Sequence, residues 1–152
     1  MDPIRIRPSA LRRSYEGDFP GLKADPSWVI TSPTTSRYNC FSWAAREEER
    51  NWSPTGDFWP SGCARELTIP AFVAAYATMG YTPGETDRSP KDVERIALFA
   101  MNEAPSHAAR QLEGGEWTSK IGENHDITHC LKALCGDIYG EIVLILERVR
   151  SH

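Results

Sequence analysis

The stretch VERIALFAMNEAPSHAARQLEGGEWTSKIG, residues 93–122, decides the fold. Its first ten residues are rich in apolar side chains and predict a strand, and SHAARQLE and EWTSKIG follow as two more strand-like segments. The adjacent glycines Gly114 and Gly115 predict a tight hairpin turn between the last two. The stretch therefore predicts three consecutive, antiparallel strands.

The segments around this stretch extend the prediction. TIPAFVAAYATMG, residues 68–80, predicts a helix with Pro70 in its first turn and Gly80 at its end. SWVIT predicts a short edge strand, DITHCLKAL a short helix capped by Asp126, and the apolar run 142–146 a strand buried on both faces. Helices come first and strands follow, so the predicted class is α+β.

The N-terminal part differs from the rest in its prolines. Prolines are so dense in residues 1–36 that we expect an irregular arm there, with Arg5, Arg7, Arg12 and Arg13 in solvent or read by an export apparatus. Residues 37–152 then form a single catalytic domain. The chain of 152 residues, 40% hydrophobic and 25% charged, is typical of one globular domain.

The charge balance and the apolar runs exclude several classes of partner. The net charge of -4 provides no basic footprint, so neither nucleic acid nor an anionic membrane is an expected partner. No apolar run approaches the roughly 18 residues of a membrane span, and the N-terminus lacks the apolar region of a Sec signal peptide. We expect a cytoplasmic protein, or one exported by another route. The oligomeric state stays open.

The segment RYNCFSWAAR, residues 37–46, contains the candidate nucleophile. Asn39 is a favourable N-cap, which puts Cys40 in the first turn of a helix expected to end near Glu49 to Asn51. Backbone N–H groups without intrahelical partners favour thiolate there, so an exposed Cys40 would be reactive. The alternative is that Cys40 is a small buried hydrophobic residue, as many free cysteines are.

The other cysteines predict neither disulfides nor a metal centre. Cys63, Cys130 and Cys135 are irregularly spaced, and free thiols are the default without a secretory signal. We considered zinc ligation by Cys130, Cys135, His125 and His129, but the paired spacing of a structural zinc site is missing. No metal or organic cofactor is predicted.

Aromatic residues supply the candidate substrate contacts. The loop 51–63 carries Trp52 and Trp59 among Pro and Gly, either as a cap on the core or as a hydrophobic wall beside Cys40. We assign Trp43, Trp52, Trp59 and Trp117 to substrate binding. His107, expected where its strand begins at a sheet end, is the candidate base, because a cysteine hydrolase needs thiol and imidazole within reach.

These two segments resemble the papain-like cysteine hydrolases of bacteria, the superfamily of the NlpC and CHAP peptidases and amidases. The resemblance rests on NCFSWA, from Asn39, and on SHAARQLEGGEWTSKIG, residues 106–122. It implies a papain-like fold in which a nucleophile-bearing helix packs on a mainly antiparallel sheet of about four strands. It also implies Cys40 as the nucleophile and His107 as the base.

The resemblance places the third catalytic residue about a dozen positions after the base, at Ser119. Family members usually carry His, Asn, Asp or Gln there, and this chain also has Ser106 where a glycine is usual before the histidine. A three-residue loop 113–115 turns Ser119 to the face of His107, whereas a two-residue turn at Gly114 and Gly115 does not. Asp126 is the alternative third residue.

The function expected from these motifs is that of a thiol peptidase or amidase acting through a thioester. Its substrate would be a peptide or protein, with peptidoglycan peptides among the candidates. By analogy alone, the arginine arm and compact domain suit an interbacterial toxin or an effector. The alternative is a non-catalytic binding module of the same fold, with a buried Cys40 and the Trp-rich loop as partner site.

Overall fold

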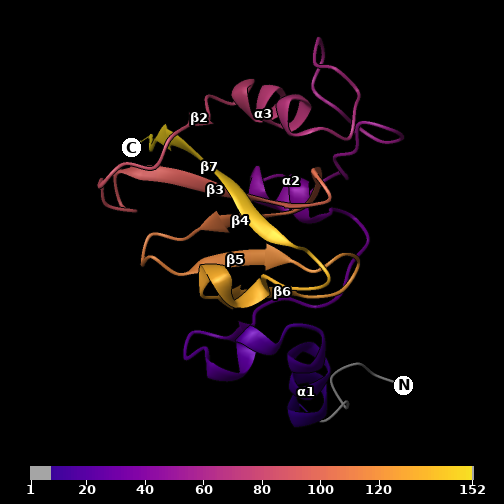
Figure 1. The fold of residues 1–152 in the computed structure, drawn as a ribbon, viewed down its shortest axis with the longest axis vertical. Helices are drawn as coiled ribbons and strands as arrows, with labels where there is room; N and C mark the ends of the chain where they lie inside the picture. The colour runs from indigo at the N-terminus through magenta and orange to yellow at the C-terminus, as the bar shows by residue number, and fades with distance from the viewer. Residues whose placement is uncertain (1–7, 152) are drawn as a thin grey trace.

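The computed structural model describes residues 8–151, and a single antiparallel sheet runs through the whole molecule (Figure 1). Its seven strands follow the order β1-β6-β5-β4-β3-β7-β2, and every neighbouring pair is antiparallel. The strands are β1 (Val29–Ile30), β2 (Thr82–Pro83), β3 (Val93–Met101), β4 (Ala104–Gln111), β5 (Trp117–Lys120), β6 (Asp126–His129) and β7 (Glu141–Val149).

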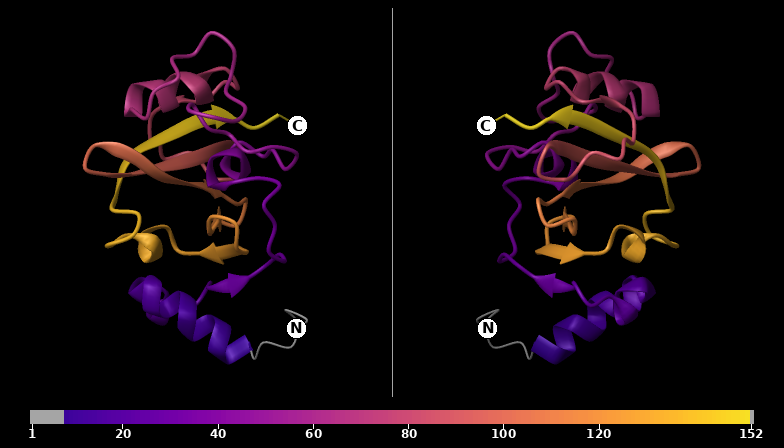
Figure 2. Two further views of the ribbon diagram at one scale, coloured as in Figure 1. Left: turned by 90° about the vertical axis from the view of Figure 1, so that its right-hand side faces the viewer. Right: turned by 90° about the vertical axis from the view of Figure 1, so that its left-hand side faces the viewer.

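The helices are short and lie around this sheet. They are α1 (Pro8–Asp18), η2 (Pro20–Ala24), α2 (Cys40–Ala44), α3 (Ile69–Ala77) and η3 (Leu131–Leu134), where η marks a 3-10 helix. Figure 2 shows α1 at the end of the molecule opposite α3, with the sheet between them. None of the helices within residues 8–151 has the length and apolar character needed to cross a membrane.

The two faces of the sheet bury two separate cores. Alternate residues of β3 point to opposite sides, so Ile96 and Leu98 pack with α2 and α3, while Ala97 and Phe99 pack with α1, η2 and η3. We call the first side the α3 face and the second side the α1 face. Because β3 is buried on both faces, it forms the centre of the fold.

This architecture corrects the predicted fold class. The sheet is mainly antiparallel as expected, but it has seven strands, and the papain-like arrangement of a helix on about four strands is wrong. The helix that carries Cys40 spans only five residues and does not reach Glu49. Arg46, with a φ of 66°, ends it, and its guanidinium is held by Glu94 at 2.7 Å.

Two segments have a different secondary structure from the predicted one. The arm 1–36 contains α1, because Pro8 occupies its first turn and Pro20 follows its end, so neither proline interrupts the helix. DITHCLKAL forms strand β6 and then η3 instead of one helix. Residues 1–7 of the arm, with Arg5 and Arg7, lie outside the described residues.

The remaining elements match the sequence more closely. The helix at 68–80 is α3, capped by the Thr68 side chain, and SWVIT contains the short strand β1 at the sheet edge. The last strand, β7, is present, but Val143 is 49% exposed, so the strand is not buried on both faces as predicted.

Candidate functional site

A capping box positions Cys40 at the first residue of α2. The Asn39 side chain accepts the Ser42 backbone N–H at 3.0 Å, and the Asn39 backbone N–H donates to Ser42 Oγ at 2.9 Å. The Asn39 amide also donates to the Trp52 carbonyl at 2.8 Å, which ties the helix start to the following loop. The predicted N-cap is confirmed, and it fixes the backbone around the thiol.

Burial decides the protonation state of Cys40. Burial raises the pKa of this thiol to about 12, although the backbone N–H groups of Ala108, Phe41 and Cys40 itself, and the Lys120 ammonium, act in the opposite direction. Of the two alternatives that the sequence left open, the structure has the buried Cys40, and the thiol carries its proton at neutral pH. The thiol lies beside the backbone of Ala108, the residue that follows His107.

His107 lies in β4 where this strand has separated from β5. The β4–β5 ladder contains only the pairs Arg110↔Thr118 and Gln111↔Trp117, and β4 begins three residues before His107, so the histidine is not at the strand start. Its ring is fully buried on the α1 face, edge-on to Phe99. Its Nδ1 has no hydrogen-bond partner, and burial, together with the charge of His129, keeps its pKa well below the usual value.

Ser119 bridges the gap between the two strands. Its Oγ lies 2.9 Å from His107 Nε2 and 2.7 Å from His129 Nε2, and all three side chains are fully buried. Leu112 N donates to Glu116 O at 2.8 Å, so the hairpin has the predicted three-residue loop. His129 was missed as a site residue because its segment was predicted to be helical. The alternation of DITH, with Ile127 and His129 on one face, was the available signal.

Asp126, the alternative third residue, lies away from His107. It pairs with Lys120 in the β5–β6 ladder, and its Oδ2 accepts the Tyr38 hydroxyl at 2.6 Å. Burial and this hydrogen bond to Asp126 raise the pKa of Tyr38. The structure thus groups Asp126 with Tyr38 and Lys120 on the opposite side of the sheet from His107.

The four tryptophans assigned to substrate binding are mostly core residues. Trp52 and Trp59 are 3% exposed within the α3-face core, and Trp117 is 6% exposed within the α1-face core. Their rings fill space and leave no wall beside Cys40. Trp43 is half-buried, stacks on Tyr38 at 5.2 Å between ring centroids and donates to Thr118 at 3.1 Å. Trp52, Phe58 and Pro60 of the same loop line a surface hollow of about 300 Å³, so the alternative of a binding module that uses this loop stays a hypothesis.

Tyr139 covers His107, and sequence reasoning missed it. The two rings stack with centroids 4.0 Å apart and planes 7° apart. Burial raises the pKa of Tyr139, and the nearby charge of a Cys40 thiolate acts in the same direction. Ser106 Oγ donates to the Tyr139 carbonyl. Reciprocal backbone hydrogen bonds of 2.9 and 2.8 Å between Gly136 and Gly140 close the loop. A side chain at Gly140 would meet the Ala100 carbonyl at 2.1 Å, so only glycine fits.

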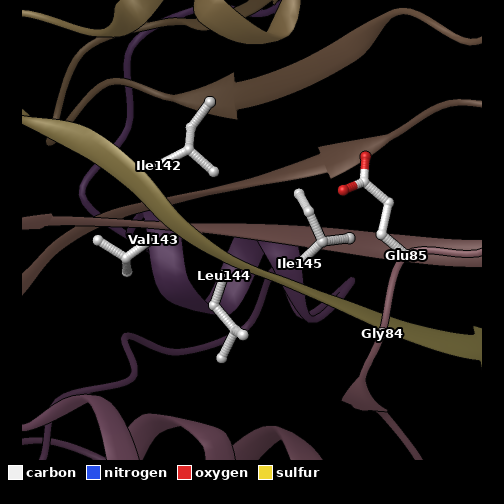
Figure 3. A pocket seen from close by; sticks show the side chains of 6 residues that line it. All are labelled: Gly84, Glu85, Ile142, Val143, Leu144 and Ile145. Carbon is white, nitrogen blue, oxygen red and sulfur yellow. The ribbon is translucent and has the colours of Figure 1, made fainter.

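The other candidate sites lie elsewhere or are missing. Within residues 8–151, no group of three or more His, Cys, Asp and Glu side chains is placed to hold a metal ion. A surface hollow of about 330 Å³ lies on the outer side of β7, lined by Gly84, Glu85 and residues 142–145 (Figure 3). None of the side chains around Cys40 and His107 lines this hollow.

Comparison with known proteins identifies the family but no activity. No curated protein and no solved structure matches the chain. One family model matches residues 29–147, from strand β1 to strand β7, and so covers every residue of the site described above. The chain therefore belongs to the family described as a domain of unknown function, DUF7689.

Proposed function

We propose that the protein is a thiol-dependent hydrolase of peptide or amide bonds, with Cys40 as nucleophile and His107 as base. One observation carries this proposal. The His107 imidazole is fully buried, and its Nδ1 has no hydrogen-bond partner. The next residue, Ala108, is the one whose backbone N–H faces the Cys40 thiol. A buried polar atom without a partner is costly in a folded protein and calls for an explanation, and a proton acceptor kept free for Cys40 supplies one.

The reaction follows from these two side chains. Cys40 and His107 Nδ1 are not hydrogen-bonded in this structure, so the opening of the site must also bring the two groups together. As the sulfur then attacks the substrate carbonyl carbon, the thiol proton passes to His107 Nδ1. The imidazolium then returns this proton to the leaving amine, the C–N bond breaks, and a thioester to Cys40 remains. Water, deprotonated by His107, hydrolyses the thioester. The backbone N–H groups of Cys40 and Ala108 are the candidates to hold the oxyanion.

The closed state requires a movement before any substrate reaches the thiol. The Tyr139 ring stacks on His107, and Cys40 is only 8% exposed. Displacing the loop 136–140 would admit both substrate and water, and would lower the burial penalty that now keeps Cys40 protonated. The resting protein is thus an unreactive form of the proposed enzyme.

The motif resemblance gives a second, more local support. It concerns the two segments that carry Cys40 and His107, since the sheet as a whole differs from the papain-like arrangement. A peptide substrate fits the proposed chemistry, and peptidoglycan peptides belong to that class. The role of toxin or effector stays a proposal by analogy.

An acyl-transfer assay tests the proposal without knowledge of the substrate. The wild-type protein is incubated with p-nitrophenyl acetate, and peptide mass spectrometry locates the acetyl group. We expect acetylated Cys40, loss of this adduct in Cys40→Ala, and a strongly reduced rate in His107→Ala. The exposed Cys130 serves as an internal reference for non-specific acetylation. The proposal is wrong if Cys130 is acetylated while Cys40 stays free, both in the wild type and after Tyr139→Ala removes the cover.

A further inference from the structure

A buried chain of hydrogen bonds connects His107 to a backbone carbonyl. His129 Nδ1 lies 2.7 Å from the Cys130 carbonyl oxygen, His129 Nε2 lies 2.7 Å from Ser119 Oγ, and Ser119 Oγ lies 2.9 Å from His107 Nε2. The three side chains are fully buried, so water does not compete for these bonds. The direction of each bond can be worked out from one end of the chain.

The carbonyl end fixes the direction. A carbonyl oxygen only accepts hydrogen bonds, so His129 Nδ1 carries a proton and donates it. Burial keeps this imidazole neutral, since it lowers the pKa of His129 to about 4, and Nε2 therefore presents a lone pair. The Ser119 hydroxyl then donates to His129 Nε2 and accepts from His107 Nε2–H.

The tautomer of His107 follows from this order. A neutral imidazole has a single N–H group, and in His107 this group is at Nε2. Nδ1 consequently carries the lone pair, and it is the nitrogen that has no hydrogen-bond partner. A reversed chain would instead bury an Nδ1–H without an acceptor and leave no base for the Cys40 proton.

We propose that His129 is a positioning residue, which acts through Ser119 to hold His107 in the tautomer with a free Nδ1. The expected effect of His129 on the rate of Cys40 acylation rests on the proposed function. The assignment of the His107 tautomer does not rest on it. When Nδ1 accepts the Cys40 proton, Nε2–H continues to donate to Ser119. The hydrogen bonds among His107, Ser119 and His129 therefore keep their directions during the reaction.

The proposal predicts different outcomes for two substitutions of the same histidine. In His129→Leu the Ser119 hydroxyl loses its acceptor, and its remaining option is to donate to His107 Nε2, which moves the His107 proton to Nδ1. In His129→Gln the side-chain carbonyl can accept the Ser119 hydroxyl and keep the original direction. Ser119→Ala removes the bridge, so His107 should populate both tautomers.

Nuclear magnetic resonance of the imidazole nitrogens tests the tautomers directly. Long-range ¹H–¹⁵N spectra of the uniformly ¹⁵N-labelled full chain should show His107 as the Nε2–H form and His129 as the Nδ1–H form. His129→Leu should convert His107 to the Nδ1–H form, and His129→Gln should not. His125→Asn is the matched control, because His125 contacts Tyr15 and takes no part in the hydrogen bonds among His107, Ser119 and His129. Nδ1–H at His107 in the wild type, or an unchanged His107 tautomer in both His129→Leu and Ser119→Ala, would overturn the proposal.

The acetylation assay provides the second readout. We expect Cys40 acetylation to fall at least about tenfold in His129→Leu, because a base in the wrong tautomer cannot take the proton. The loss should be smaller in Ser119→Ala, where His107 populates both tautomers. His129→Gln should recover most of the rate. Equal rates in the Leu and Gln variants would contradict the positioning role. If Cys40 is acetylated neither in the wild type nor after Tyr139→Ala, the proposed hydrolase is overturned. The tautomer spectra still test the hydrogen bonds among His107, Ser119 and His129 independently.

Discussion

The two faces of the sheet are filled in different ways. On the α3 face, aromatic rings pack edge to face, as in the pairs of Phe72 with Phe41 and with Trp59, and the indole N–H groups of Trp52 and Trp59 are bonded. On the α1 face, between Phe99 and Tyr139, the chain of His107, Ser119 and His129 lies buried with one nitrogen unpartnered. Both faces bury a hydrophobic core, but only the α1 face also buries the polar group of His107, Ser119 and His129, which the proposed function assigns to catalysis.

The largest effect on stability is expected on the α3 face. Phe72 is fully buried, so Phe72→Ala should lower the free energy of unfolding by about 3 to 5 kcal/mol. Urea unfolding measures this loss. A change below about 1 kcal/mol would show that the aromatic cluster does not dominate the stability of this face.

The pH dependence of stability should come from the α1 face. The pKa of His129 is about 4 in the folded protein and about 6.5 when unfolded, so the unfolded state binds more protons between these values. The protein should therefore lose about 3 kcal/mol as the pH falls from 6.5 to 4, with no further loss from this group below pH 4. Unfolding at several pH values, in wild type and His129→Gln, isolates the contribution. Identical pH profiles would contradict it.

Ser119→Ala should have a smaller effect on stability than Phe72→Ala. The substitution leaves two buried imidazole nitrogens without a partner, which costs about 1 to 3 kcal/mol. Thr118→Val is the matched control on the other face of β5, where the half-buried Trp43 loses a single acceptor. If the two variants unfold at the same urea concentration, the buried chain contributes less to the α1 face than its geometry indicates.

The hairpin was predictable because its local signals agree. Two glycines and the alternating strands allowed only two registers, and the structure has the one that places Ser119 on the face of His107. The capping box at Asn39 was equally local. Such features are determined by residues that are close in sequence, so one sequence is enough to predict them.

The errors concern contacts between distant segments. Strand β6 forms because it is paired on both sides, with β1 and with β5, and its helix-like sequence DITHCLKAL gives way to these pairings. His129 reaches Ser119 only as a result of that strand. Tyr139 likewise reaches His107 through a loop that local patterns did not single out. Cys40 is likewise buried against segments distant in sequence, among them the backbone of Ala108 and the Lys120 side chain.

We propose that Tyr139, which stacks on His107, limits access to a Cys40 thiol whose reactivity depends on His107. The most direct measurement is the rate at which iodoacetamide modifies Cys40 at neutral pH, followed by peptide mass spectrometry with Cys130 as the reference. We predict slow modification in the wild type, a gain of at least about tenfold in Tyr139→Ala, and loss of that gain in Tyr139→Ala combined with His107→Ala. A gain that survives without His107, or no gain when Tyr139 is removed, would contradict the claim.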